Sequence, residues 1–473
     1  MFCQLDALRQ CLPSSLQRTL AELPESLDET YSRIVMDIKK GNRADAYRML
    51  QCLAVAIRPL SVAELAELLA FDFDATKGGI PKLNSKWRWE DHEQAVLSTC
   101  SSLITIVPAD GSPVVQFSHF SVKEFLMSDR LVTSTKDISQ YHIVVEDANT
   151  LIAKACLGFL LRDSVDESDT VTAPLARYAA EHWVAHAKVK NVASRIRDGM
   201  EFLFDADRPY FSAWVKLYNA DNRYWGSGME NIMQRAAPLY HAAFLGLHEI
   251  VEHLALKYPQ YANAISGGGG TALHSVSREG HLEVVRSLLN CGAGVNARGI
   301  VGMSPLQLAS IGGPLDVMQC LLEHGANANF QDDYGRTSLI LAVDTGHLGV
   351  IRMLLEHNAD IHIQDKRGLT PLHNKVLNYS FYSASNDLQV VRLLLEHGAN
   401  PNTRDNRRRT PLHEVSSPSS YPELSRLEIA RTLLAHGADV DAEDEEGMTP
   451  LQRALAENQE ELVQLLSEYS STK

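Results

Sequence analysis

A tetrapeptide recurs through the second half of this 473-residue chain at nearly constant intervals. Six clear copies begin at Thr271, Ser304, Thr337, Thr370, Thr410 and Thr449, and a degenerate copy begins at Ala237. The first four clear copies lie 33 residues apart, and the last two intervals are 40 and 39 residues. A chain with such a period folds as stacked units, because one short unit cannot bury its apolar face alone. The repeats therefore predict a solenoid of seven units over residues 236–473, the first degenerate and the last a cap.

Each copy has the composition of a helix pair. Thr or Ser at the first tetrapeptide position caps a helix, and Pro at the next position fits its first turn. A second helix ends in a Leu pair. It is followed by a residue that tolerates the left-handed conformation, such as Gly325, Gly398 or Gly437, with Asn358 in one copy. Arg408 takes the place that Gly335, Gly368 and Gly447 occupy in neighbouring copies, which predicts backbone strain there.

The segments Thr370-Pro371-Leu372-His373 and Leu321-Leu322-Glu323-His324-Gly325-Ala326 show the pattern most clearly. They resemble the ankyrin repeat, with its T-P-L-H and L-L-x-x-G-A signatures. The resemblance implies an array that binds proteins through its hairpin tips and inner helices. The repeat histidines, among them His274, His373 and His413, are expected to bond loop and helix-end backbone groups rather than to take part in catalysis.

The first half has a different pattern. It predicts three segments: a helical arm over 1–40, a winged-helix domain over 41–135 and a helical bridge over 136–235. The winged-helix prediction rests on three helical segments, on capping boxes that begin at Ser61 and Ser121, and on β-like runs at 103–107 and 114–117. The predicted fold class is therefore mainly α, with a winged-helix-containing helical region before an ankyrin-repeat α-solenoid.

Three runs of the first half resemble the segment that follows the NTPase core in fungal NACHT (STAND) signalling proteins. They extend from Leu23 to Tyr31, from Arg58 to Leu60 and from Phe117 to Leu126. In that family a winged helix, often catalogued beside GPI inositol-deacylases, precedes a helical bridge and an ankyrin array. The resemblance implies that the family's phosphate-binding loop would lie upstream of Met1, so that this chain is the C-terminal portion.

The sequence carries no recognisable catalytic or metal-binding motif. It lacks a G-x-x-x-x-G-K-[ST] loop and a G-x-S-x-G elbow, which nucleotide and acyl chemistry respectively need. His248 and His253 are five residues apart, about 140° around a helix at 100° per residue, and so do not share a zinc ion. His182 and His186 share a face but have no third ligand nearby, and the seven cysteines form no C-x-x-C pair. We expect no enzyme activity, no cofactor and no metal.

Charge argues against several classes of partner. The chain has 44 basic and 59 acidic residues, a formal charge of −15. Residues 41–135 carry 9 basic and 11 acidic groups, and residues 236–473 carry 18 and 28. Such surfaces repel phosphate, so we expect no direct nucleic acid and no membrane partner. No signal peptide is visible, and the expected location is cytoplasmic, with the nucleus possible. We expect a monomer, unless the chain belongs to a larger NTPase assembly.

Hairpin tips are where a repeat consensus leaves freedom, and they are the best guide to a partner. Read in order, the tips change from apolar through basic to acidic: Ile300 and Val301, Asp333 and Tyr334, Lys366 and Arg367, Asn406 and Arg407, then Glu445 and Glu446. This predicts a partner with an apolar anchor and an acidic stretch. The alternative is that these are ordinary solvated loop residues.

The two long intervals come from insertions between paired helices, which we expect to lie side by side. They contain Tyr379, Phe381, Tyr382 and Tyr421. Loop drift and a second binding knob are both compatible with this composition. The run Arg407 to Arg409 is open to two interpretations, pairing with the acidic stretch Glu443 to Glu446 or a short nuclear import signal.

Three functions fit these observations. The first is a non-catalytic adaptor that binds proteins through the ankyrin groove. The second is the C-terminal sensor or regulatory part of a NACHT-type signalling NTPase. The third is a nuclear coregulator that binds a transcription factor rather than DNA.

Overall fold

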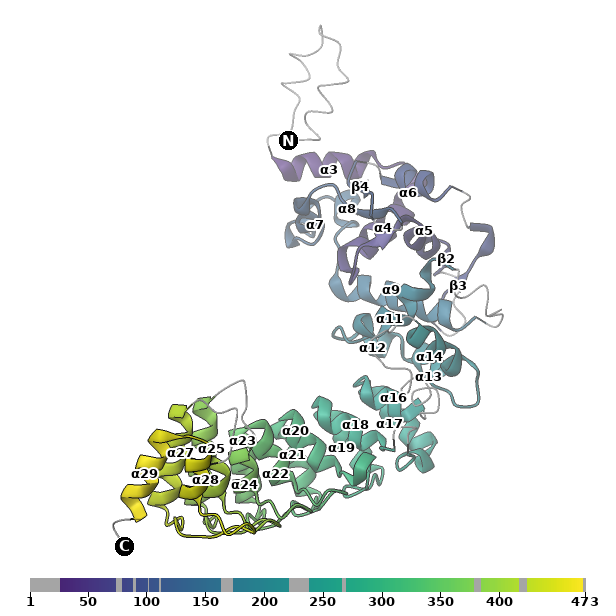
Figure 1. The fold of residues 1–473 in the computed structure, drawn as a ribbon. Coiled ribbons are helices and arrows are strands. Elements are labelled where there is room, and N and C mark those ends of the chain that lie inside the picture. The colour runs from purple at the N-terminus through teal and green to yellow at the C-terminus, as the bar shows by residue number, and fades with distance from the viewer. Residues whose placement is uncertain are drawn as a thin grey trace. The chain divides into compact units, whose positions relative to one another are not determined.

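The computed structural model describes residues 26–73, 79–87, 91–100, 102–109, 112–162, 173–220, 238–265, 269–377, 384–416 and 423–470. It consists of two compact units, Met1–Glu230 and Asn231–Lys473 (Figure 1). The first contains mixed helices and short strands, and the second contains helix pairs.

The first unit contains the predicted winged-helix layout. Three helices come first, followed by a β-hairpin: α4 (Arg43–Val55), α5 (Val62–Leu69), α6 (His92–Cys100), β4 (Ile104–Val107) and β5 (Val114–Phe117). The short strand β1 (Leu60–Ser61) pairs with β5, which gives an antiparallel sheet in the order β1-β5-β4. Val115 faces both Leu60 and Ile106 across this sheet and is buried. The remaining short strands, β2 (Phe71–Asp72) and β3 (Lys82–Leu83), form a separate antiparallel pair.

Helix α5 begins with the predicted capping box. Ser61 Oγ accepts the Glu64 N–H at 3.1 Å, and Glu64 Oε2 accepts the Ser61 N–H at 2.8 Å. The buried Glu64 carboxylate also binds the Arg58 guanidinium at 2.6 Å. This pairing raises the pKa of Arg58 further above its ordinary value.

The second predicted capping box is wrong. Helix α7 (Phe120–Leu126) begins one residue earlier than Ser121, and His119 is its N-cap, with Nδ1 accepting the Ser121 N–H at 3.3 Å. Ser121 Oγ instead bonds His119 Nδ1 at 2.6 Å and the hydroxyl of Tyr31, 2.7 Å away on α3 (Leu27–Asp37). Ser121 thus joins α7 to α3, and an imidazole does the capping that we assigned to its hydroxyl.

The remaining helices of this unit follow α7 in the chain. They are α8 (Lys136–Ser139), α9 (Val145–Leu160), α11 (Leu175–Ala187), α12 (Val192–Arg195), α13 (Arg197–Leu203) and α14 (Tyr210–Ala220). Two of them, α9 and α11, pack onto the winged helix. Helices α9 and α11 contact each other extensively, and α9 also contacts α4. A buried chain of hydrogen bonds joins them: His186 bonds the Tyr178 hydroxyl through Nε2 at 2.8 Å and Asn149 Oδ1 through Nδ1 at 2.7 Å. Burial lowers the pKa of His186 to about 4, so this imidazole is neutral at physiological pH.

The second unit is a solenoid of helix pairs, as the period predicts. Seven pairs are described: α16 (Pro238–Phe244) with α17 (His248–Lys257), α18 (Ala272–Glu279) with α19 (Leu282–Asn290), α20 (Pro305–Gly312) with α21 (Leu315–Glu323), α22 (Ser338–Thr345) with α23 (Leu348–Glu356), α24 (Pro371–Leu377) with α25 (Ala384–Glu396), α26 (Pro411–Val415) with α27 (Glu423–Ala435), and α28 (Pro450–Ala456) with α29 (Glu460–Ser470). Figure 1 shows them side by side, from teal to yellow. The tetrapeptide leucines of the first six pairs, such as Leu306 and Leu412, are buried between the helices, and Leu451 of the last pair is partly exposed.

The helix ends follow the predicted chemistry. Thr271, Ser304, Thr410 and Thr449 each form a capping box. Asn358 takes the left-handed conformation at φ 60°, in the place where other second helices are followed by glycine.

Buried histidines connect consecutive repeats, as expected from their positions. His274 Nδ1 accepts the Thr271 N–H at 3.1 Å, and its Nε2 bonds the Met303 carbonyl in the next loop at 3.0 Å. His373 and His413 make the same pair of contacts in their repeats. Burial lowers the pKa of all three, although their carbonyl partners act in the opposite direction. These neutral imidazoles fix the loops that carry the hairpin tips.

Candidate protein-interaction surface

The loops between repeats form a continuous row. We call this the fingertip row and number its five tips in chain order: Ile300–Val301, Asp333–Tyr334, Lys366–Arg367, Asn406–Arg407 and Glu445–Glu446. One backbone hydrogen bond joins each tip to the next, and the N–H···O distances are 2.9 Å from Asp333 to Val301, 2.9 Å from Lys366 to Tyr334, 3.1 Å from Asn406 to Arg367 and 3.0 Å from Glu445 to Arg407. The predicted tip residues are therefore brought together on one edge of the array.

A buried or half-buried aspartate shapes each of the last four tips. Asp332 Oδ1 accepts the N–H groups of Tyr334 and Arg336, at 2.9 and 2.8 Å. Asp365, Asp405 and Asp444 make the equivalent two bonds in their own loops. Each carboxylate accepts hydrogen bonds from backbone N–H groups of its own loop. The turn that this fixes leaves the two residues after each aspartate pointing outward.

The first tip is built differently, since Gly299 stands where the others have aspartate. Its turn is closed, as in the other four tips, by a backbone bond, here from the Gly299 N–H to the Met303 carbonyl at 2.7 Å, but no carboxylate supports it. Val301 is forced to a positive φ of 48°. A β-branched residue is strained there, at a cost of roughly 1–3 kcal/mol.

The apolar end of the row is exposed. Ile300 is 57% exposed, Val301 37% and Tyr334 55%, on two tips that are bonded to each other. The charge beside them is partly neutralised, because Asp333 pairs with Arg298 at 2.6 Å. Sequence reasoning missed Arg298. Its guanidinium also lies over the Phe330 ring, 5.3 Å from the centroid.

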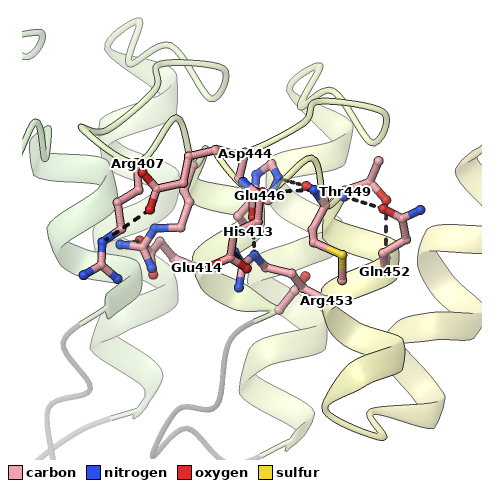
Figure 2. A network of polar contacts seen from close by, with 12 residues as sticks. Arg407, His413, Glu414, Asp444, Glu446, Thr449, Gln452 and Arg453 are labelled. Atoms are coloured by element: carbon pink, nitrogen blue, oxygen red, sulfur yellow. Dashed lines mark hydrogen bonds and ion pairs between the residues drawn. The ribbon is translucent and has the colours of Figure 1, made fainter.

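The acidic end is organised around Asp444 (Figure 2). The Arg453 guanidinium binds the buried Asp444 carboxylate and reaches Glu446 at 3.2 Å. Burial by itself would raise the pKa of Asp444, but the Met448 N–H and Arg453 outweigh it and hold the pKa below its ordinary value. Arg407 lies 3.9 Å from Glu445, so one of the proposed pairings between the arginine run and the acidic stretch is present.

The other two arginines of that run have different environments. Arg409 is half-buried and binds Asp405 at 2.9 Å and the fully buried Glu414 at 2.8 Å. Burial raises the pKa of Glu414, and Arg409 opposes this. Arg408 is exposed and has the predicted strain, with a φ of 58°. This costs about 1 kcal/mol relative to glycine. The Arg409–Glu414 pair was not foreseen, because neither residue lies at a consensus position.

The proposed insertion knob lies outside the described residues. Tyr379, Phe381, Tyr382 and Tyr421 all fall there. The described residues before and after the first insertion carry a fully buried ion pair between Lys375 and Asp387, with Nζ and Oδ1 2.5 Å apart. Sequence analysis did not identify this pair.

Cys52 and Cys100 of the first unit have buried thiols. Burial raises the pKa of the Cys52 thiol to about 12 and that of Cys100 to about 11. Across the parts of the chain that the structure describes, no cluster of three His, Cys, Asp or Glu side chains has the geometry to hold a metal ion. No helix in those same parts has the length and apolar character that a bilayer crossing needs.

Comparison with known families identifies a domain in each half of the chain. A model described as the winged-helix domain of GPI inositol-deacylase matches residues 33–137. A model of ankyrin repeats in three copies matches residues 273–365, 360–444 and 380–473. The chain is an ankyrin-repeat protein with an N-terminal winged-helix domain. Its ankyrin array provides a protein-interaction surface.

Two curated relatives share parts of this organisation. "Azaphilone pigments biosynthesis cluster protein L" of Monascus ruber is 32% identical over 304 residues, 60% of this chain and 62% of the relative. Alpha-latrocrustotoxin-Lt1a of Latrodectus tredecimguttatus is 35% identical over 72 residues, 15% of this chain and 5% of the toxin. The chain thus spans less than two thirds of the length of either relative.

Two solved ankyrin domains are similar to part of the array. The ankyrin repeat domain of Bcl-3, described as a unique member of the IkappaB protein family, is 29% identical, with a TM-score of 0.41 over 46% of this chain and 93% of that one. An ankyrin repeat domain from Acinetobacter baumannii AYE is 30% identical, with a TM-score of 0.38 over 43% of this chain and 98% of that one.

Proposed function

We propose that this chain is a non-catalytic adaptor that binds a protein partner through the fingertip row of its ankyrin array. The observation that carries the proposal is the exposed apolar cluster of Ile300, Val301 and Tyr334 on two hydrogen-bonded tips. Tyrosine is enriched at interface hot spots, and exposed apolar side chains grouped on one edge mark interaction sites.

The scaffold beneath this cluster favours recognition without rearrangement. His274 bonds the loop of the first tip, and Gln307 bonds the loop of the second through the Arg336 carbonyl at 2.6 Å. A surface that is fixed before binding loses less conformational entropy when a partner docks. The excess of acidic over basic groups in residues 236–473, 28 against 18, supports a protein rather than a nucleic acid as the partner.

The test is affinity capture from an extract of the source cells, with the full chain as bait and quantitative mass spectrometry as readout. The test bait carries Ile300→Ser and Tyr334→Ser. The control bait carries Leu256→Ser, a matched apolar-to-polar change on α17 at a side chain that is 73% exposed. We expect wild type and control to retain the same protein, and the double variant to lose it by more than roughly tenfold. Equal recovery on all three baits would contradict the proposal.

A second candidate is that the chain is the sensor and regulatory part of a NACHT-type signalling NTPase. The winged-helix match over 33–137 favours it, because this module precedes ankyrin arrays in the fungal proteins that the sequence resembles. The mass of the native polypeptide, measured by immunoblot against the repeats, separates the two. A species near 52.4 kDa supports the adaptor, and a much larger one supports the NTPase.

A further inference from the structure

Five exposed basic side chains gather at the third and fourth tips. We call Lys366, Arg367, Arg404, Arg407 and Arg408 the basic patch. Cross-loop bonds hold its two loops together: Asn406 donates from its backbone to the Arg367 carbonyl at 3.1 Å and from its side chain to the Lys366 carbonyl at 2.8 Å. The patch stands out because the array around it is acidic overall.

The acids nearest the basic patch in sequence are already engaged. Asp365 Oδ1 accepts the N–H groups of Arg367 and Leu369, at 2.8 and 2.9 Å. Asp405 is bound by two backbone N–H groups and by Arg409. Glu414 is bound by the same Arg409, which does not belong to the patch, and Arg367 of the patch also acts to lower the pKa of Glu414, although it lies beyond ion-pair distance.

Most of the patch therefore lacks a counter-charge at close range. Arg407 on the fourth tip forms an ion pair with Glu445 on the fifth tip, with Nε and Oε1 3.9 Å apart. Among the residues that the structure describes, Lys366, Arg367, Arg404 and Arg408 form no ion pair within 4.0 Å. Gathering like charges in this way raises the energy of the free protein unless an anion is bound.

Arg408 gives a second, independent observation. It is held at a φ of 58°, and the equivalent Gly335, Gly368 and Gly447 have φ values of 78°, 80° and 75°. The turn thus requires a conformation that glycine adopts without strain, yet the position carries an exposed arginine. Backbone strain of this kind is usually kept where it serves a function. Because the Arg408 side chain is exposed and forms no ion pair, that function would be a contact with another molecule.

We infer that the basic patch docks an acidic segment of the protein partner, one with several closely spaced carboxylates. This inference rests on the proposed function and names the chemistry of its partner. The fifth tip limits where the segment can lie, because Glu443, Glu445 and Glu446 are exposed there and repel carboxylates. The acidic segment therefore occupies the third and fourth tips, and the residues of the partner that bind Ile300 and Tyr334 lie to one side of it.

The test measures binding of a fluorescein-labelled peptide of alternating glutamate and serine to the full chain, by fluorescence anisotropy at low salt. The control peptide has glutamine in place of glutamate, and a single-stranded oligothymidine tests for a nucleic acid instead. The decisive variant is Arg408→Gly, and Arg431→Gly is a control for loss of a basic residue on the helix α27, away from the tips. Arg367→Gln provides a second patch variant without a backbone effect.

Arg408→Gly separates binding from folding, because its two effects have opposite signs. Relief of the strained φ raises the melting temperature, by roughly 2–4 °C. Loss of the guanidinium weakens binding of the glutamate peptide roughly fivefold. Arg367→Gln weakens it similarly, Arg431→Gly does not, and added salt weakens wild-type binding.

Three results would overturn the inference: no preference for glutamate over glutamine, equal affinity of the Arg408→Gly and Arg367→Gln variants and wild type, or tighter binding of the oligothymidine than of the glutamate peptide. Self-association of the chain at low salt, abolished by Arg408→Gly, would show that its acidic fifth tip is the occupant and would also overturn it. The capture experiment distinguishes this failure from failure of the proposed function. A partner that is lost with Ile300→Ser and Tyr334→Ser but retained by Arg408→Gly and Arg367→Gln refutes only the acidic segment.

Discussion

The buried ion pair between Lys375 and Asp387 allows a strong test of how the array is held together. Lys375 lies on α24 and Asp387 on α25, and their side chains are 0% and 1% exposed. Lys375 Nζ also donates to the Val343 carbonyl of the preceding repeat at 3.4 Å. The two opposite charges contact each other inside the fifth helix pair. Their attraction offsets the hydration free energy that each charge loses on burial.

Replacing Lys375 by methionine keeps the length of the side chain but leaves the Asp387 carboxylate without its cation. Breaking a buried pair from one side costs about 3–5 kcal/mol, because the remaining charge stays desolvated after its opposite charge is removed. For a unit of this size, 1 kcal/mol shifts the melting temperature by about 2–4 °C. The Lys375→Met variant should therefore melt roughly 10 °C or more below wild type. The double variant Lys375→Met with Asp387→Leu removes both charges and should recover most of that loss.

The protein offers an internal control for this measurement. All five tryptophans precede residue 226, so their fluorescence reports the first unit. Far-UV circular dichroism reports both units, and most of the described helices lie in the array. We expect both variants to leave the tryptophan transition in urea unchanged, while the dichroism transition moves only for Lys375→Met. A double variant as unstable as the single one would refute the argument that the loss comes from a broken buried ion pair.

Two further predictions concern the buried hydrogen-bond networks. Burial lowers the folded-state pKa of His274, His373 and His413, so below the ordinary histidine pKa the unfolded chain binds more protons than the folded one. The contribution of these histidines to stability is therefore complete above the ordinary pKa near 6.5 and falls as the pH drops below it. Glutamine already occupies the same repeat position at Gln307. Changing all three histidines to glutamine should flatten this decline in stability in dichroism melts between pH 7 and pH 5. An unchanged decline would exclude these histidines as its cause. In the first unit, Tyr178→Phe removes the hydroxyl that bonds His186 at 2.8 Å and should lower the unfolding free energy by about 1–3 kcal/mol in the tryptophan transition, with no effect on the array. Parallel loss in both transitions would contradict the separation into two units.

Much of the array was predictable because its rules are local. The period required stacked units, and the capping of Thr410 by His413 depends on residues three apart in the chain. The left-handed conformations of Asn358 and Arg408 follow from where neighbouring copies have glycine. The winged-helix layout was likewise predictable from turns and caps at fixed spacing. The prediction was wrong at Ser121, because the N-cap of that helix is His119.

Tertiary structure decided which charged side chains form ion pairs inside the protein and which stay exposed and unpaired. The sequence placed arginines at 407, 408 and 409 in a row. Folding brought the half-buried Arg409 into contact with Asp405 and Glu414, set Arg407 beside Glu445, and left Arg408 exposed. It also closed the Lys375–Asp387 pair. The physical reason is that burial and pairing depend on neighbours that folding brings together from other repeats and helices, whereas capping, turn chemistry and periodicity are fixed by residues only a few positions away.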